Sequence, residues 1–320
     1  MPKPTVLAPA ALPALITEQL GARYELIELA GADDAVSTLA DCAGRVRAIV
    51  TQGAVVDRAF MEALPNLQIV ANFGVGYDKV DARAAADLGV IVTNTPDVLN
   101  EEVADTTLGL LLMTIRQLPQ ADRFVREGAW VKEAFPLTSS SLQGRKVGIV
   151  GMGRIGEAIA RRLEAFGVVP AYHARNQRTH LSYTYYDNLL SMSADVDTLI
   201  VIVPGGAATE HMINRDVLEA LGANGILINV ARGSVVDEPA LIKALQENVI
   251  LSAGLDVFED EPKVPQALID MEHVVLLPHV GSASVPCRNA MGQLVVDNIV
   301  SWFQTGAPVT PVAETPAPVL

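Results

Sequence analysis

Short apolar runs alternate with amphipathic segments in the N-terminal part of the chain. Up to about residue 98 the apolar runs are TVLAP, YELIEL, VRAIV, LQIVAN and GVIVTN, and segments such as DDAVSTLADCAG and VDRAFMEAL separate them. Such runs are typical of strands and the segments between them of helices, so the pattern predicts βα units and a mostly parallel sheet. The first residues fit as a strand, a turn and a helix rather than a signal peptide, because Pro4, Pro9 and Pro13 interrupt the apolar run.

A second series of the same kind follows a long amphipathic stretch. That stretch, EEVADTTLGLLLMTIRQLPQADRFVREG, starts at Glu101 and predicts a connecting helix with Asn100 as its N-cap. After the loop LTSSSLQG come the apolar runs KVGIV, VVPAY, TLIVIV, GILINV, LSAGLDV and VVLLP, which suit a sheet covered by helices on both faces. From about Ser282 a helical pattern resumes, and the prolines of APVTPVAETPAPVL predict a frayed tail.

Composition narrows the class of protein. The 320 residues suit two domains or one large α/β domain, and 50% hydrophobic with 19% charged residues indicates a packed globule. The net charge of -14 argues against nucleic acid or an anionic membrane surface as a partner. No apolar run is long enough for a membrane span. Cys42 and Cys287 have neither disulfide-framework nor zinc-site spacing, so we expect buried free thiols, no metal site and a cytoplasmic protein.

A glycine motif predicts a dinucleotide site. Gly151, Gly153 and Gly156 in KVGIVGMGRIGEAIARRLEAFG directly follow an apolar strand and open an amphipathic helix, which is the context this motif requires. The first glycine permits a tight turn, the second lets a diphosphate approach the backbone, and the third lets the helix pack on the strand. The N–H groups at the start of the helix would then hold the diphosphate.

The end of the next strand carries bases where an acid is expected. A carboxylate about 20 residues after the glycines normally binds the ribose 2′-hydroxyl, but Tyr172 to Gln177 contain none. His173, Arg175 and Arg178 lie there instead. A guanidinium can hold a 2′-phosphate in a bond worth about 1.5–3 kcal/mol, so the sequence favours NADPH over NADH. The alternative is that these arginines belong to a solvated turn.

Six segments together carry a family resemblance. They are NFGVGYDKVD (72–81), VTNTPDVLNEEVAD (92–105), the glycine motif, INVARGSVVDEPAL (228–241), AGLDVFEDEP (253–262) and LPHVGSAS (277–284). In this order they resemble the D-isomer-specific 2-hydroxyacid dehydrogenases over nearly the whole chain. Within this family the segment YHAR replaces a strand ending of the Tyr-Asp type. In this respect the chain is similar to the NADPH-dependent glyoxylate/hydroxypyruvate reductases and hydroxyphenylpyruvate reductases.

The resemblance implies an α/β fold of two doubly wound parallel-sheet domains. Residues 99–284 would form a Rossmann cofactor domain, and 1–98 with 285–320 a flavodoxin-like substrate domain. The active site is then expected in the cleft between them, where closure excludes water before hydride transfer.

Three residues have the chemistry that reduction of a 2-keto acid requires. His279 follows the apolar run VVLLP, and an imidazole is a suitable general acid near neutral pH; the other four histidines lack such a setting. Glu261 matches the family residue that pairs with this histidine, which would favour the imidazolium. Arg232 ends GILINVAR and matches the arginine that binds the substrate carboxylate and polarises the carbonyl. For Glu261 and Arg232 the alternative is a structural salt bridge.

Further contacts are implied by the resemblance alone. The substrate carboxylate would also bind the backbone amides of Val75 and Gly76, with Arg232 and His279 as the other substrate contacts. Asp256 would contact the nicotinamide carboxamide. The remaining cofactor contacts would be Thr107, Arg154, Ile155, Val203, Pro204, Val230, Ala231 and Gly281.

Segment 118–145 resembles the arm through which members of the family dimerise, so a homodimer is expected. Trp130 in this segment would reach a neighbouring active site or lie in an ordinary dimer contact; the sequence leaves both open.

Taken together, the sequence predicts an oxidoreductase that reduces a 2-keto acid of the glyoxylate/hydroxypyruvate class to the D-2-hydroxy acid with NADPH. One alternative is a reductase for aromatic 2-keto acids, since the loops at Thr51–Gly53, Val75 and Leu99–Asn100 set the size of the pocket. The other is a dinucleotide-sensing regulatory protein on the same fold, which the set Arg232, Glu261 and His279 disfavours. Formate dehydrogenase chemistry is disfavoured because those relatives carry an amide in place of Glu261.

Overall fold

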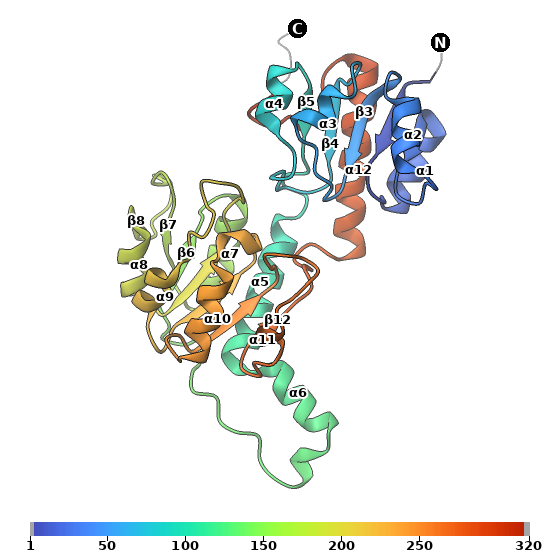
Figure 1. The fold of residues 1–320 in the computed structure, drawn as a ribbon. Coiled ribbons are helices and arrows are strands. Elements are labelled where there is room, and N and C mark those ends of the chain that lie inside the picture. Colours follow the sequence, from blue (N-terminus) through green and yellow to red (C-terminus); the bar gives the residue numbers. More distant parts are fainter. Residues whose placement is uncertain (1–2, 317–320) are drawn as a thin grey trace. The chain divides into compact units, whose positions relative to one another are not determined.

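Two parallel β-sheets organise the chain, as the alternating pattern predicts. The computed structural model describes residues 3–316 (Figure 1). The chain divides into a first unit, residues 1–99 and 284–320, and a second unit, residues 100–283. Each boundary lies one residue from the boundary expected from the sequence. The roles given to the two units above stay predictions.

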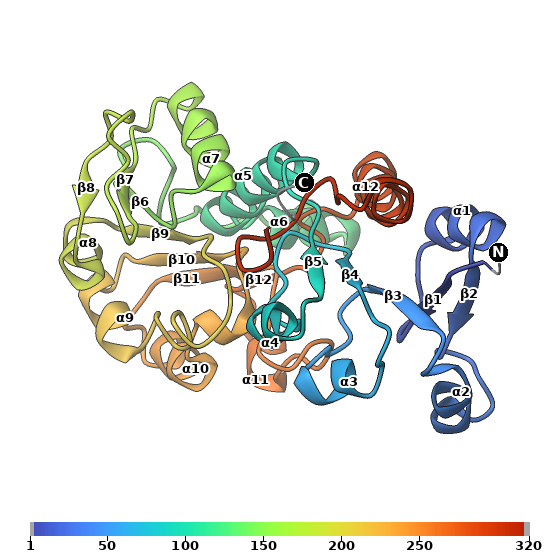
Figure 2. The same ribbon diagram turned by 90° about the horizontal axis from the view of Figure 1, so that it is seen from above.

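The first unit is built on a five-stranded sheet of order β2-β1-β3-β4-β5. Every apolar run predicted there forms a strand, and all neighbouring strands are parallel. Helices α1 and α12 cover one face of the sheet, and α2, α3 and α4 cover the other (Figure 2). The elements are β1 (Thr5–Ala8), α1 (Ala14–Arg23), β2 (Glu25–Glu28), α2 (Ala35–Cys42), β3 (Val46–Thr51), α3 (Arg58–Glu62), β4 (Ile69–Asn72), α4 (Ala82–Asp87), β5 (Ile91–Thr93) and α12 (Val285–Thr305).

The second unit is built on a seven-stranded sheet of order β12-β11-β10-β9-β6-β7-β8. Its strands are β6 (Val147–Val150), β7 (Ala171–His173), β8 (Tyr185–Tyr186), β9 (Thr198–Val201), β10 (Ile226–Asn229), β11 (Ser252–Leu255) and β12 (Val275–Leu276). Its helical elements are α5 (Asn100–Arg116), α6 (Leu118–Arg126), η1 (Ala129–Val131), α7 (Arg154–Ala165), α8 (Leu189–Asp195), α9 (Arg215–Leu221), η2 (Gly233–Val235), α10 (Glu238–Gln246) and α11 (Gln266–Ile269). The chain reverses direction across the sheet between β6 and β9, and open α/β sheets bind ligands at such a switch point.

Helices cover both faces of this second sheet, which explains its continuously apolar strands. One buried cluster joins the sheet to α8, α9 and α10, and another joins it to α5 and α7. Within the described residues no helix is both long and apolar enough to cross a membrane.

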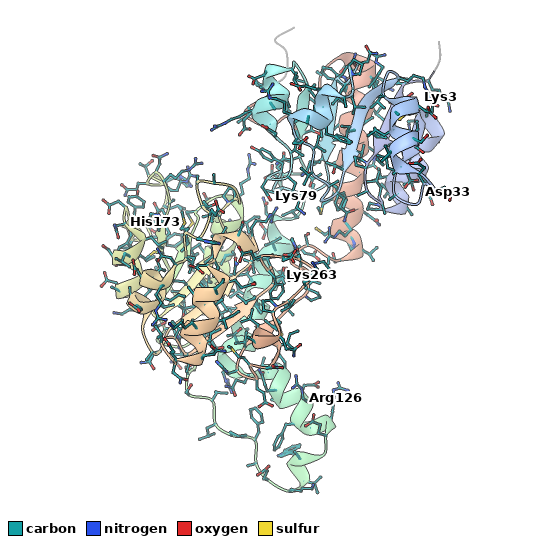
Figure 3. The ribbon with its side chains drawn as sticks, in the orientation of Figure 1. Lys3, Asp33, Lys79, Arg126, His173 and Lys263 are labelled. Carbon is teal, nitrogen blue, oxygen red and sulfur yellow. The ribbon has the colours of Figure 1, made fainter. Side chains whose placement is uncertain are left out.

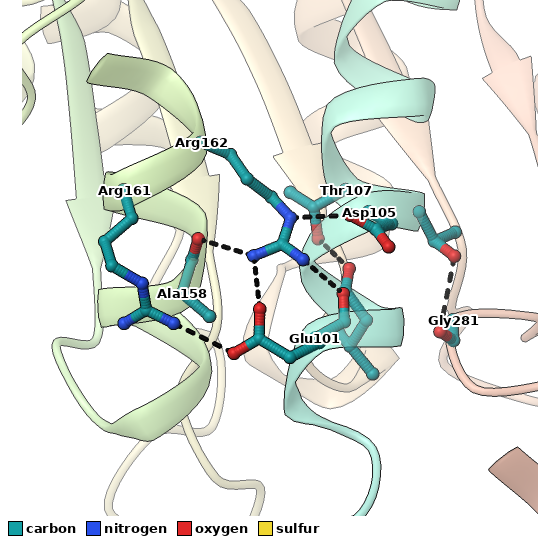
Figure 4. Close-up of polar contacts among 9 residues, drawn as sticks. Glu101, Asp105, Thr107, Ala158, Arg161, Arg162 and Gly281 are labelled. Atoms are coloured by element: carbon teal, nitrogen blue, oxygen red, sulfur yellow. Dashed lines mark hydrogen bonds and ion pairs between the residues drawn. The ribbon is translucent and has the colours of Figure 1, made fainter. Parts of the chain in front are cut away.

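An ion-pair cluster fixes α5 against α7 (Figure 4). Glu101 accepts from Arg161 Nη2 at 2.9 Å and from Arg162 Nη1 at 2.7 Å, and Asp105 accepts from Arg162 Nε at 2.6 Å. The first turn of the connecting helix, α5, is thereby tied to the helix that follows the glycine turn.

The single connecting helix predicted from Glu101 is wrong in two respects. The chain forms two helices, α5 and α6, and Gln117 between them adopts a left-handed conformation with φ 50°. Pro119 accounts for the break, because a proline inside a continuous helix lacks the N–H that bonds the preceding turn and its ring clashes with the carbonyl there, whereas a proline is tolerated in the first turn of a new helix. In addition, Asn100 is the first residue of α5 rather than its N-cap.

The prediction of a frayed C-terminal tail is also wrong for the part of the tail that the structure describes. Val312 N donates to Val92 O at 2.9 Å, and Val92 N donates to Thr315 Oγ1 at 2.9 Å. Both tail side chains are buried against β5. Residues 317–320 of the predicted tail lie outside the described residues. The prolines exclude a helix here, but they allow an extended segment that pairs with an edge strand.

Both cysteines are buried thiols outside any disulfide, as predicted. Cys42 ends α2, and Cys287 lies in the first turn of α12.

Candidate active site

The predicted site residues of the second unit follow the carboxyl ends of its strands. Because all seven strands are parallel, these ends meet at one edge of the sheet. The glycine turn follows β6, His173 ends β7, Val203 follows β9, Arg232 follows β10, Asp256 and Glu261 follow β11, and His279 follows β12.

The three motif glycines have different surroundings. Gly151 has φ +107°, and a Cβ on it would lie 2.3 Å from Ile202 O. A Cβ on Gly156 would lie 2.2 Å from Gly151 O, so the close approach of α7 to the turn requires a glycine there. A Cβ on Gly153, the N-cap of α7, would meet nothing within 4 Å. The fold therefore needs the first and third glycines, whereas Gly153 leaves open space in front of the helix.

The basic residues predicted to select the cofactor lie next to this turn. Arg178 Nε donates to Met152 O at 2.9 Å, inside the glycine turn, and Arg178 N donates to Tyr172 Oη at 2.8 Å. Figure 3 labels His173. Its Nδ1 lies 2.9 Å from Tyr186 O of β8, a two-residue edge strand that the sequence analysis missed. Arg175 is exposed. Arg178 is thus held beside the turn and Arg175 is open to solvent.

His279 and Glu261 form the pair expected from the sequence. His279 Nδ1 lies 2.8 Å from Glu261 Oε2. Burial would raise the pKa of Glu261, but the hydrogen bond and charge of His279 outweigh it and lower the pKa below its usual range. A carboxylate here accepts the Nδ1 proton, which leaves Nε2 of His279 to exchange a proton with a ligand.

The carboxylate of Asp256 holds the loop that carries His279. It accepts from Val280 N at 2.7 Å and from Gly281 N at 2.8 Å, and its own backbone oxygen accepts from His279 N at 2.8 Å. His279 has φ 54°, a left-handed conformation that is uncommon outside glycine. Asp256 is 2% exposed, and burial raises its pKa. These bonds were not anticipated from the sequence, and the predicted nicotinamide contact of Asp256 stays a prediction.

Arg232 is positioned by a buried asparagine that the sequence analysis also missed. Asn229 Nδ2 donates to Arg232 O at 3.0 Å, and Asn229 Oδ1 accepts from Ala231 N at 3.1 Å. The next residue, Gly233, packs on the Phe258 backbone so closely that a Cβ would lie 1.9 Å from it. The sequence does contain a signal for this role, because Asn229 is a polar residue at the end of the otherwise apolar run GILIN.

The other predicted cofactor residues lie as follows. Arg154 and Ile155 begin α7, and the Val203–Pro204 segment is held by Thr209 Oγ1, which donates to Pro204 O at 2.6 Å. Val230 and Ala231 are buried. Figure 4 includes Thr107, whose buried hydroxyl donates to Val103 O at 2.7 Å, and Gly281, whose carbonyl accepts from Thr106. Their cofactor contacts stay predictions.

In the first unit, the loop after β4 directs its carbonyl groups toward its own unit. Asn72 Nδ2 donates to Gly74 O and Gly76 O at 3.1 Å each, and Asn94 Nδ2 donates to Val75 O at 2.9 Å. Within residues 3–316 the N–H groups of Val75 and Gly76 have no hydrogen-bond acceptor. These two amides, which the family resemblance assigns to a substrate carboxylate, are therefore available to an anion.

The doubly covered parallel sheet, the glycine turn and the His–Glu pair define an α/β dehydrogenase. The chain belongs to the D-isomer specific 2-hydroxyacid dehydrogenase family, whose NAD binding domain matches residues 108–281. It is 43% identical to hydroxyphenylpyruvate reductase of Plectranthus scutellarioides and to glyoxylate/hydroxypyruvate reductase A of Arabidopsis thaliana, in each case over 96% of this chain and 98% of the relative. The resemblance stated from the sequence is thereby confirmed.

A solved structure is similar over nearly the full length. The NADPH-dependent glyoxylate/hydroxypyruvate reductase of Sinorhizobium meliloti, in complex with NADP and malonate, is 55% identical with a TM-score of 0.94, and the match covers 98% of both chains. The two-sheet α/β fold predicted from the sequence is confirmed by this similarity and by the strand order.

Proposed function

We propose that the protein reduces small 2-keto acids of the glyoxylate and hydroxypyruvate class to D-2-hydroxy acids, with NADPH as the preferred hydride donor. The observation that carries the proposal is the 2.8 Å contact between His279 and Glu261, on the sheet edge that also bears the glycine turn. The names of the relatives from Arabidopsis thaliana and Sinorhizobium meliloti support it.

The proposed roles follow from the chemistry of each group. A bound nicotinamide supplies a hydride to the carbonyl carbon. His279 gives its Nε2 proton to the carbonyl oxygen, and Glu261 stabilises the imidazolium before that transfer. Arg232 holds the substrate carboxylate and polarises the carbonyl, and the amides of Val75 and Gly76 bind the same carboxylate.

The test is a panel of kcat/KM values for glyoxylate, hydroxypyruvate, pyruvate and phenylpyruvates, each with NADPH and with NADH. Oxidation of NADPH with glyoxylate or hydroxypyruvate is the expected result. Absence of oxidation with every 2-keto acid would contradict the proposal and favour a dinucleotide-sensing role.

A second candidate is reduction of aromatic 2-keto acids. It is favoured by the identity with the hydroxyphenylpyruvate reductase of Plectranthus scutellarioides over 96% of this chain. A higher kcat/KM for hydroxyphenylpyruvate than for hydroxypyruvate in the same panel would select it.

Preference for NADPH is expected to depend on Arg175 and Arg178. Arg175→Ala removes an exposed guanidinium that is free to bind a 2′-phosphate, so KM for NADPH should rise about tenfold. Arg178→Ala should have at least the same effect, because Arg178 is already held beside the glycine turn by Met152 O. KM for NADH should stay nearly unchanged in both variants, since NADH lacks that phosphate. Equal effects on the two cofactors would assign these arginines to the turn instead.

We further propose that the protein is a homodimer formed through segment 118–145. Figure 1 shows α6 and the loop after it extending away from the second sheet. Apolar side chains in this arm are exposed: Trp130 at 67%, Val131 at 92% and Leu137 at 99%. Exposed apolar groups gathered on one segment mark an interaction surface. Contact between Phe124 and Phe135, at 5.4 Å between ring centroids, holds the arm together internally.

Replacing both Val131 and Leu137 with Asp is expected to convert the dimer to a monomer, because each carboxylate would be buried without a partner. Sedimentation equilibrium measures the mass. Val36→Asp is the matched control, since Val36 is 80% exposed on α2 in the first unit and should leave the dimer intact. A monomeric wild-type protein, or a dimer that survives the double substitution, would contradict the arm as the interface.

We also propose a cytoplasmic location, which cell fractionation tests.

A further inference from the structure

An arginine in the first unit has an aromatic contact and no acidic partner. The guanidinium carbon of Arg288, in the first turn of α12, lies 5.6 Å from the centroid of the Phe73 ring. Among residues 3–316 no carboxylate or carbonyl pairs with this partly buried guanidinium. Two other arginines of this unit do pair with acids, Arg45 with Glu25 and Arg58 with Asp87, whereas Arg47 stacks on Phe303 as Arg288 stacks on Phe73.

The Phe73 contact places Arg288 next to the predicted carboxylate loop. Phe73 is 5% exposed and directly precedes Gly74, Val75 and Gly76, whose carbonyl oxygens are taken by Asn72 and Asn94. The amides of Val75 and Gly76 and the guanidinium of Arg288 thus form one set of unpaired donors on the first unit. A stack on an aromatic face holds the guanidinium plane while leaving its N–H groups free for a ligand.

We propose that Arg288 is a specificity-determining residue that hydrogen-bonds a polar substituent on C3 of the 2-keto acid. This inference rests on the proposed function, in which the C1 carboxylate is held by Arg232 and by the amides of Val75 and Gly76. A carboxylate offers about four lone-pair sites, and a bidentate arginine with two amides fills them. Arg288 is therefore left for a hydroxyl or a second carboxylate further along the substrate. The chemical class that fits is a 2-keto acid with a polar substituent on C3, and hydroxypyruvate, whose substituent is an uncharged hydroxyl, is a small example.

Hydroxypyruvate and pyruvate test the proposal because they differ by one hydroxyl group. The measured quantity is the ratio of their kcat/KM values with NADPH in the unchanged protein and in Arg288→Met, which keeps an apolar chain against Phe73. The ratio is expected to favour hydroxypyruvate and to fall about tenfold in Arg288→Met, the usual effect of losing a hydrogen bond to a charged group. In Arg288→Lys, which keeps the charge, part of the preference for hydroxypyruvate that is lost in Arg288→Met should return. A ratio measured on one preparation does not depend on the fraction of folded enzyme, so a purely structural role for Arg288 would leave it unchanged.

Arg47→Met is the matched control. Arg47 makes the other arginine–phenylalanine stack of this unit, with its guanidinium carbon 5.7 Å from the centroid of Phe303, but it lies near the start of β3 rather than at the strand ends. Its removal should leave the ratio as it is. Equal losses with both substrates in Arg288→Met, an unchanged ratio, or no preference for hydroxypyruvate in the unchanged protein would each overturn the inference. Failure of the proposed function is a different result, namely no turnover of either substrate by the unchanged protein.

Discussion

Replacing His279 with alanine is expected to lower kcat for glyoxylate by about 10²- to 10⁴-fold, the usual contribution of a general acid. The reason is geometric: Nδ1 of His279 is taken by Glu261 at 2.8 Å, so Nε2 is the one nitrogen of the pair that can protonate a carbonyl. The Kd for NADPH should change little, because the glycine turn and the arginines beside it follow β6 and β7, whereas His279 follows β12. Steady-state NADPH oxidation gives kcat, and quenching of protein fluorescence by NADPH gives Kd.

The Glu261→Gln variant separates the two members of the pair. It keeps one oxygen that can accept from His279 but removes the negative charge that favours the imidazolium, so the expected loss of kcat is smaller than in His279→Ala. Loss of NADPH binding in His279→Ala, with kcat preserved at saturating cofactor, would show that His279 has been given the wrong role.

The second large effect is expected from replacing Gly156 or Gly153 with alanine, where the first change should lower stability and the second should weaken NADPH binding. In Gly156→Ala the new methyl group would lie 2.2 Å from Gly151 O, closer than any real contact, so α7 must shift. Overpacking of this kind lowers the free energy of unfolding by about 1–3 kcal/mol. In Gly153→Ala the methyl group meets nothing within 4 Å, so the free energy of unfolding should stay near that of the unchanged protein.

NADPH affinity should respond differently from stability. The open space in front of Gly153 is where a diphosphate would approach the N–H groups of α7, so Gly153→Ala should raise the Kd for NADPH by tenfold or more, about 1.4 kcal/mol. Urea unfolding without cofactor measures the free energy of unfolding, and fluorescence titration measures the Kd for NADPH. A stable Gly156→Ala variant, or a Gly153→Ala variant with unchanged Kd, would contradict the roles given to these glycines.

Much of this organisation could be predicted because it depends on local pattern. Each apolar run of the βα series forms a strand, and the chain turns at Gly151 as the spacing requires. His279 and Glu261 meet because they follow adjacent parallel strands, β12 and β11, whose carboxyl ends lie at the same edge. The sequence also contains a signal for the break between α5 and α6, namely Pro119, but the amphipathic pattern continues across the break and favours a single helix.

Other features depend on contacts between distant segments, which periodicity does not record. The tail through residue 316 pairs with β5 across more than two hundred residues, although its prolines suggest fraying. The two-residue strand β8 exists because it extends the sheet beside β7. In the same way, the bonds from the Asp256 carboxylate to the backbone of the His279 loop join segments that are distant in the sequence, and they add to the predicted cofactor contact of Asp256 without testing it.

The sequence by itself determined the alternation of strands and helices, the glycine turn and the basic residues in place of the ribose acid, because each is a matter of residue type at short spacing. It also determined which histidine and glutamate pair, because both lie in motifs that follow strands in a recognisable order. The tertiary structure decided how these residues are held. Asp256 supports the strained backbone of His279, Asn229 positions Arg232, and Phe73 meets Arg288 only through the packing of α12 on the first sheet. The physical reason is that a side chain buried against a distant segment leaves no periodic trace in the sequence.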